Sequence, residues 1–219
     1  MENKIDINYE IGHQYAVNGD YEEAYYYLKK SLKEGNYKAA NDIGVMLQKT
    51  KRYVEAADMY RKAIELGCSG EANVNLGNLY ENGLGVRQDY EKAREYYLKA
   101  LDSKYPFAYA KMAKLYALGL GVSFDYRLTR KYITEGAKLE KEGNYTHVDC
   151  TFMLGYHHHY GLGVKRNDKI AFKLWSICAS HGDFEAKYRQ DAVAGDGCLG
   201  REGDVRQEDR RHHPHHLYY

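Results

Sequence analysis

The sequence of 219 residues has only two prolines, Pro106 and Pro214, and lacks an apolar run of the roughly 18 residues that a membrane-spanning helix needs. Long helices are therefore permitted along almost the whole chain, and no membrane partner is expected. The first residues also lack an apolar stretch of signal-peptide length, so the expected location is cytoplasmic.

An excess of charge of one sign is missing as well. The 32 basic side chains nearly balance the 31 acidic ones, so the net charge of +1 provides no field for nucleic acid, and no nucleic-acid partner is expected. The four cysteines, Cys68, Cys150, Cys178 and Cys198, are widely spaced and form no C-x-x-C pair. We expect reduced thiols, with Cys178 inside the hydrophobic core.

What the sequence does have is a repeat. A small residue recurs at intervals of 32, 33, 36 and 42 residues, which is the period range of helical-pair solenoids. We call these residues the anchors: Gly12, Gly44, Gly77, Ala113 and Gly155. A second small residue follows each anchor by 12 or 16 positions: Ala24, Ala56, Ala93, Thr129 and Ala171. Each repeat is predicted to be a pair of helices, with the anchor on helix A and the second small residue on helix B.

The last three repeats contain four additional residues between helix A and helix B. The insertions, at residues 83–86, 119–122 and 161–164, all read Gly-Leu-Gly-Val. Their glycines can adopt the positive φ that lets a chain reverse after a helix. An aspartate follows each insertion, and Asp89 is predicted to cap helix B. Asp20 is predicted to cap the first helix B, with Glu23 at the reciprocal capping-box position.

Tyrosine is abundant, with 24 residues spread along the chain. Tyrosines at helical spacing around the anchors are predicted to lie in the core. They are Tyr15, Tyr60, Tyr80, Tyr97 and Tyr116.

One unit runs from Ala72 to Ala100 and reads Ala-Asn-Val-Asn-Leu-Gly-Asn-Leu-Tyr-Glu-Asn-Gly-Leu-Gly-Val-Arg-Gln-Asp-Tyr-Glu-Lys-Ala-Arg-Glu-Tyr-Tyr-Leu-Lys-Ala. It closely resembles the Sel-one-like repeat, a relative of the tetratricopeptide repeat. The units near Tyr109 and Thr151 are similar to it, whereas the first two units, without the insertion, resemble plain tetratricopeptide repeats. The resemblance covers residues 7–188 and implies an all-α fold, a right-handed α-α superhelix (solenoid) of about five antiparallel helix pairs.

The chain departs from this pattern near its C-terminal end. The step of 42 residues predicts a longer helix or loop in the fourth repeat. We predict a helical repeat domain at residues 1–188 and a flexible or irregular tail at residues 189–219, which is rich in glycine and charge. Residues 182–186 resemble the start of a sixth repeat. A truncated repeat protein without retained activity, and self-association through an uncapped C-terminal face, therefore remain alternatives.

Three consecutive histidines, His157, His158 and His159, raise the alternative of a metal-dependent or enzymatic module. Neighbouring residues on a helix point about 100° apart, however, and cannot converge on one ion. The Gly-x-Gly loops lack the Lys-Ser/Thr of a phosphate-binding loop, and no nucleophile is recognisable. We therefore predict no enzymatic activity, no cofactor and no metal. His158 is expected to be half-buried, at the position that Tyr80 and Tyr116 occupy in their repeats.

The resemblance to tetratricopeptide repeats implies partner contacts on the concave side of helix A, one and four residues after each anchor and three before it. The predicted partner-binding residues are Tyr9, His13, Asn41, Gln48, Asn78, Glu81, Lys114, Phe152, Tyr156 and His159. This mixture of aromatic and polar groups favours a peptide or a partner domain, with Tyr9, Phe152 and Tyr156 as anchors. The predicted function is a protein-interaction scaffold or adaptor.

Overall fold

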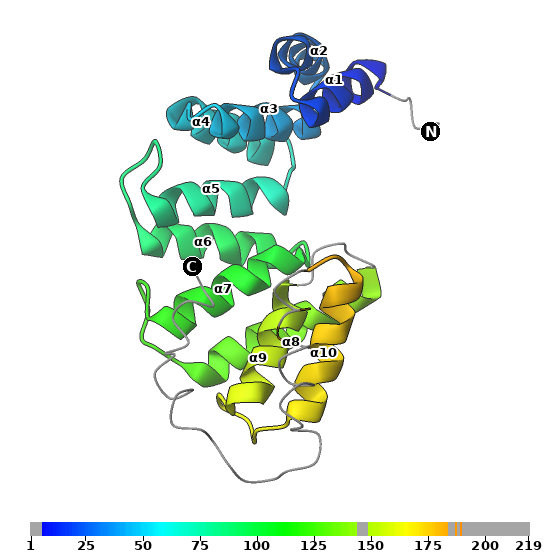
Figure 1. Ribbon diagram of the computed structural model, residues 1–219. Coiled ribbons are helices and arrows are strands. Elements are labelled where there is room, and N and C mark those ends of the chain that lie inside the picture. Colours follow the sequence, from blue (N-terminus) through cyan, green and yellow to red (C-terminus); the bar gives the residue numbers. More distant parts are fainter. Residues whose placement is uncertain (1–5, 144–148, 184–186, 188, 190–219) are drawn as a thin grey trace. The chain divides into compact units, whose positions relative to one another are not determined.

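The structure, a computed structural model, describes residues 6–143, 149–183, 187 and 189 (Figure 1). Ten helices and no strand form among these residues. They are α1 (Ile7–Asn18), α2 (Tyr21–Lys33), α3 (Tyr37–Lys49), α4 (Tyr53–Glu65), α5 (Glu71–Asn82), α6 (Tyr90–Leu101), α7 (Pro106–Leu118), α8 (Tyr126–Gly143), α9 (Asp149–Tyr160) and α10 (Asp168–Ser180). Odd-numbered helices are the A helices and even-numbered helices the B helices of repeats 1 to 5. The all-α class and the five helix pairs are confirmed.

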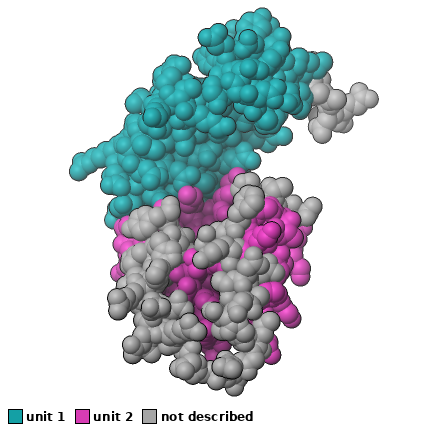
Figure 2. Space-filling view, in the orientation of Figure 1, with its two compact units in different colours: residues 1–104 teal, residues 105–219 magenta. Residues whose placement is uncertain are grey.

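The chain divides into two compact units (Figure 2). Unit 1, Met1–Lys104, contains repeats 1 to 3, in which each A helix packs on its own B helix, α2 packs on α3, and α4 packs on α5. Unit 2, Tyr105–Tyr219, contains repeats 4 and 5, joined by the packing of α8 on α9. The domain boundary predicted after residue 188 stays a prediction, because apart from Arg189 the expected tail lies outside the described residues.

The anchors are small because helix B brings a large side chain against helix A at each of them. An added Cβ would lie 2.6 Å from a ring atom of Tyr60 at Gly44, 2.5 Å from Tyr97 at Gly77, and 2.6 Å from Trp175 at Gly155. Repeat 4 has the larger anchor Ala113 and, at the equivalent helix-B position, the smaller Ile133, both fully buried. The size of the anchor is therefore matched to the size of the side chain that faces it.

The tyrosines take two kinds of position. Tyr60 and Tyr97 are fully buried, which confirms that they belong to the core. The other three predicted core tyrosines are only half-buried, because each stacks on a helix-B tyrosine at the edge of its helix pair. The ring centroids lie 5.9 Å apart for Tyr15 and Tyr27, 5.6 Å for Tyr80 and Tyr96, and 5.7 Å for Tyr116 and Tyr132.

The ends of the helices follow the predicted turn chemistry with exceptions. Gly83 and Gly85 adopt φ values of 67° and 68°, as their role in the reversal requires. Asp89 caps α6, because its Oδ1 accepts a hydrogen bond from Lys92 N at 2.9 Å. Asp20 stands at the N-cap of α2 but makes no side-chain capping bond, so that prediction is wrong. Its backbone (φ −81°, ψ 74°) is less extended than that of Asp89 (φ −157°, ψ 99°).

Helix α8 is longer than its counterparts, with 18 residues, as predicted for the fourth repeat. Its last turns place the buried Glu140 at the start of α9. The Glu140 carboxylate accepts hydrogen bonds from Cys150 N at 2.8 Å, Thr151 N at 2.9 Å and Thr151 Oγ1 at 2.7 Å. Burial raises the pKa of Glu140, and these bonds partly oppose the increase. The extra length of α8 thus supplies the N-terminal cap of the next helix.

Candidate partner-binding surface

In unit 1, the A helices of repeats 1 and 2 are joined by a polar and aromatic contact. His13 Nδ1 on α1 lies 2.7 Å from Asp42 Oδ2 on α3. The ring of His13 also stacks on Tyr9, with centroids 5.6 Å apart, and Lys38 Nζ lies 5.8 Å from the centre of the Tyr9 ring. The side chain of His13 is 48% exposed and that of Asp42 17%. A partner can therefore reach this contact.

The same kind of contact continues to repeat 3. Asn41 Nδ2 on α3 donates to Glu71 Oε2 on α5 at 3.2 Å, and Asn75 Nδ2 on α5 donates to Asn41 Oδ1 at 3.1 Å. We call the six residues that connect the three A helices the helix-A row: Tyr9, His13, Asn41, Asp42, Glu71 and Asn75. The helix-A row is thus a set of polar side chains crossing three consecutive repeats.

Charged and titratable side chains lie close together along the helix-A row. Burial and the negative charge of Asp42 raise the pKa of Glu71, while Lys38 and His13 act in the opposite direction. Burial and the neighbouring Asp42 likewise raise the pKa of the Tyr9 hydroxyl. Two carboxylates therefore face one lysine and one histidine, and the surface favours a polar ligand over a strongly charged one.

We expect Glu71→Gln to raise the free energy of unfolding at pH 7, because the amide removes a partly desolvated negative charge that Asp42 repels. The gain should be only about 0.5 kcal/mol, because Glu71 keeps access to solvent, which screens the repulsion. The amide oxygen can still accept from Asn41. Because the pKa of Glu71 is higher in the folded state than the 4.5 of the unfolded chain, the wild type loses stability as pH rises above 4.5. At pH 4 the carboxyl is largely protonated, so the stability gain of Glu71→Gln should vanish. Urea denaturation at both pH values measures this difference.

The matched control is Glu55→Gln on α4. Glu55 is exposed and pairs with Arg52, whose Nε lies 2.7 Å from Glu55 Oε1. The control should leave stability unchanged or lower it slightly at pH 7. An equal gain for Glu71→Gln at pH 4 and pH 7 would contradict the role of Asp42.

Several of the residues predicted to contact a partner instead pack on helix B. Tyr60 OH donates to Gln48 Oε1 at 2.9 Å. Tyr97 OH lies 2.7 Å from Glu81 Oε2 and 2.9 Å from Asn78 Oδ1. Glu81 is 4% exposed, and Asn41 of the helix-A row is 4% exposed as well. Gln48 and Glu81, each four residues after an anchor, thus turn toward a helix-B tyrosine, which corrects the expectation that they face a partner.

The predicted residues of unit 2 are also enclosed to a large extent. Tyr156 is 1% exposed, and the guanidinium of Arg189 lies 5.3 Å from the centre of its ring. The half-buried Phe152 contacts Trp175, with ring centroids 6.3 Å apart, and its carbonyl accepts from Trp175 Nε1. Lys114 on α7 is half-buried. Of the three predicted aromatic anchors, Tyr156 is therefore closed to a partner in this structure.

The three consecutive histidines have separate surroundings. His157 is fully buried and Nδ1 donates to the Leu162 carbonyl at 3.0 Å, while burial lowers its pKa to about 4. His158 is half-buried, as expected for the position of Tyr80. His159 Nδ1 lies 2.8 Å from Asp168 Oδ1. Within residues 6–143 and 149–183, no three His, Cys, Asp or Glu side chains gather as metal ligands.

Sequence reasoning missed three residues that build the surface: Asp42, Glu71 and Asn75. Asp42 and Asn75 each lie two residues before their anchors, Gly44 and Gly77. The position one residue after an anchor was predicted to contact a partner, and it is three residues further along the same helix. Residues three apart share a face of a helix, and this spacing was the available signal. Glu71 is the first residue of α5, and no periodic pattern marks it.

The fold and this surface define a helical-pair repeat protein. The sequence profile of the Sel1 repeat, the family called Sel-one-like above, matches residues 8–36, 38–68, 70–105, 106–140 and 148–183. The chain belongs to the Sel1 repeat family. Among the described helices, none is long and apolar enough to cross a membrane.

Solved structures with the same fold support this assignment. A Sel1 repeat protein from Oxalobacter formigenes is 26% identical, with a TM-score of 0.70, over 84% of this chain and 74% of that one. The protective antigen c5321 of uropathogenic Escherichia coli, described as displaying an SLR fold, is 25% identical, with a TM-score of 0.68. That likeness covers 90% of this chain and 42% of the antigen.

A curated relative is similar over a shorter stretch. The ERAD-associated E3 ubiquitin-protein ligase component HRD3 of Candida glabrata is 33% identical over 87 residues. This stretch is 40% of the present chain and 10% of HRD3. The chain thus matches about a tenth of the length of that relative.

Proposed function

We propose that the chain is an interaction scaffold that holds a peptide segment of a partner protein along the helix-A row of unit 1. Sel1 repeat proteins are generally scaffolds for protein–protein interaction and are generally not catalytic. The observation that carries the proposal is the continuous row of polar side chains across α1, α3 and α5. A peptide laid across the row meets hydrogen-bonding groups from three consecutive repeats.

The chemistry of the row favours a polar peptide with an aromatic or cationic group. The stacked rings of Tyr9 and His13 offer an aromatic face at one end. Asp42 in the row, and Lys38 beside Tyr9, can each pair with a charge of the partner.

The similarity to HRD3 supports a role in assembly. That protein is a component of a ubiquitin ligase. The support extends to holding a protein partner and not to a pathway. The cytoplasmic location and self-association stay predictions.

The experiment is affinity capture from native cytosol with the full chain and the variant Tyr9→Ala/His13→Ala. We expect a partner that the wild type retains to be lost at least about tenfold in the variant, which corresponds to about 1.4 kcal/mol of binding free energy. Retained proteins are identified and quantified by mass spectrometry.

The control is Tyr26→Ala on α2, which removes an exposed tyrosine from helix B of the same repeat. Proteins retained through the helix-A row should remain bound to this control. Equal loss in both variants would point to a nonspecific aromatic surface. Full retention by Tyr9→Ala/His13→Ala would overturn the proposed surface.

A further inference from the structure

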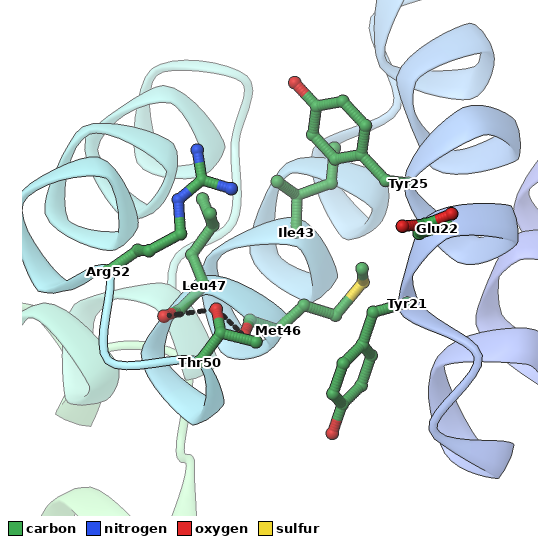
Figure 3. Close-up of a pocket in the computed structure, with 8 residues that line it drawn as sticks. All are labelled: Tyr21, Glu22, Tyr25, Ile43, Met46, Leu47, Thr50 and Arg52. Carbon is green, nitrogen blue, oxygen red and sulfur yellow. Dashed lines mark hydrogen bonds between the residues drawn. The ribbon is translucent and has the colours of Figure 1, made fainter.

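Unit 1 contains an apolar pocket outside the helix-A row, between α2 and α3. It has a volume of about 220 Å³ and is lined by Tyr21, Glu22, Tyr25, Ile43, Met46, Leu47, Thr50 and Arg52 (Figure 3). We call it the α2–α3 pocket. Tyr21 and Tyr25 face the aliphatic side chains of α3 in Figure 3. The Met46 and Leu47 carbonyls share the Thr50 hydroxyl proton, so this proton is not available to a ligand.

The equivalent space of repeat 3 is occupied by the chain itself. Leu84 and Val86 of the Gly-Leu-Gly-Val insertion pack against the core cluster that contains Leu76 and Leu79. Gly85 rests on the start of the preceding helix B, since a Cβ added there would lie 2.5 Å from Val54 N. A glycine turn bearing a leucine and a valine thus covers helix B of the preceding repeat.

Repeat 5 uses its insertion in the same way. A Cβ added at Gly163 would lie 3.8 Å from Cβ of Tyr126, the first residue of the preceding helix B. Tyr126 in α8 is equivalent to Tyr21 in α2, because both precede the small helix-B residue by three positions. Leu162 of the insertion packs on the core of repeat 5.

Repeat 2 cannot fill this space itself. Its connection between helix A and helix B consists of residues 50–52, whereas repeat 3 uses residues 83–89. The four missing residues are the Gly-Leu-Gly-Val insertion. The start of α2, with Tyr21 and Glu22, is therefore left uncovered, and the α2–α3 pocket is the space that an insertion would occupy.

We propose that the α2–α3 pocket binds an apolar side chain, leucine or valine, that a partner protein presents on a glycine-containing turn followed by a basic residue. The insertions of repeats 3 and 5 show the chemistry that fits such a space. Met46 and the two tyrosines form an adaptable apolar wall for it.

The charge at the mouth of the pocket supports a basic residue after the turn of the partner. Glu22 is exposed at the rim, and Arg52 at the opposite rim is already paired with Glu55. A basic residue follows two of the chain's three insertions, Arg87 after Val86 and Lys165 after Val164, whereas Ser123 follows Val122. The exposed carboxylate of Glu22 would attract a basic residue that follows the turn of a partner.

The test uses the full chain with ¹³C-labelled methionine methyl groups and the probe peptide acetyl-Gly-Leu-Gly-Val-Arg-amide. We expect a saturable shift of the Met46 methyl signal and none of Met112, which is buried in α7. Acetyl-Gly-Ser-Gly-Ser-Arg-amide should bind at least about tenfold more weakly, because it lacks the apolar side chains. An unmoved Met46 signal would overturn the proposal.

Two variants locate the probe. Replacing residues 50–52 by Gly-Leu-Gly-Val-Arg-Gln-Asp should abolish the Met46 shift and raise Tm by about 3 °C, because the graft fills the pocket. Glu22→Lys, an exposed substitution, should weaken the arginine peptide several-fold. A shift that persists unchanged in both variants would overturn the proposal.

A second copy of the chain is the competing occupant. If it fills the pocket, the Met46 signal of the protein alone will move on dilution, and this result would overturn binding of a separate partner. The helix-A row is untouched by both variants, so the outcome is independent of the proposed function.

Discussion

Between pH 7 and pH 4, the wild type is expected to lose about 3 kcal/mol of unfolding free energy through His157, and His157→Leu should not show this loss. His157 is fully buried on α9, and burial lowers its pKa from 6.5 to about 4. A depressed folded-state pKa means that the folded state binds fewer protons than the unfolded state. Stability is therefore complete above pH 6.5 and is lost as pH falls toward 4.

The measurement is urea denaturation of the wild type and of His157→Leu at several pH values between 7 and 4. Leucine is the residue at this position in repeats 3 and 4, as Leu79 and Leu115, so the substitution fits the repeat. The difference in unfolding free energy between the two proteins should change by about 3 kcal/mol over this range. The control His181→Gln removes an exposed histidine and should show no such change. A constant difference for His157→Leu would contradict the assigned burial.

The anchor Gly44 is expected to tolerate no side chain. Gly44→Ala should lower the free energy of unfolding by about 2 kcal/mol, because the new methyl group overlaps the buried ring of Tyr60 at 2.6 Å. This figure already allows for the roughly 1 kcal/mol by which alanine is a better helix former. Chemical denaturation followed by circular dichroism measures the effect.

A compensating change tests the cause. Repeat 4 combines Ala113 with Ile133 at the equivalent positions, so Tyr60→Ile should relieve the overlap created by Gly44→Ala. In a double-mutant cycle, we expect the pair to be about 2 kcal/mol more stable than the sum of the single effects. Additive effects would show that steric overlap is not the reason for glycine at this position.

The helix pairs were predictable because their signals are local. The spacing of the anchors gives the length of the repeat, and a glycine on helix A indicates where helix B packs closely against it. Asp89 follows its turn directly, and its capping role is readable from that position. Glu140 shows the limit, since it caps α9 only because α8 extends far enough to bring it there.

The candidate surface was predictable only in part. His13 lies on helix A, and its contact with Asp42 joins two repeats, while its contact with a partner stays a prediction. Glu81 was misplaced because its position faces the hydroxyl of a buried tyrosine from helix B, and no pattern within helix A reports that partner. The spacing along helix A places Asp42 on the predicted face, but its partner His13 lies 29 positions away, and no pattern within repeat 2 reports that contact. Contacts between repeats follow from the stacking and not from the composition of one helix.

The matching of anchor size to the facing side chain also restricts how such a gene can be rearranged. A recombination that breaks the chain between two repeats keeps each glycine with its own tyrosine or tryptophan, so whole repeats can be duplicated or exchanged. A recombination within a repeat that joined helix A of repeat 4, with Ala113, to helix B of repeat 2, with Tyr60, would place a methyl group where only a hydrogen atom fits. Recombination points that preserve the fold should therefore fall between repeats, after helix B.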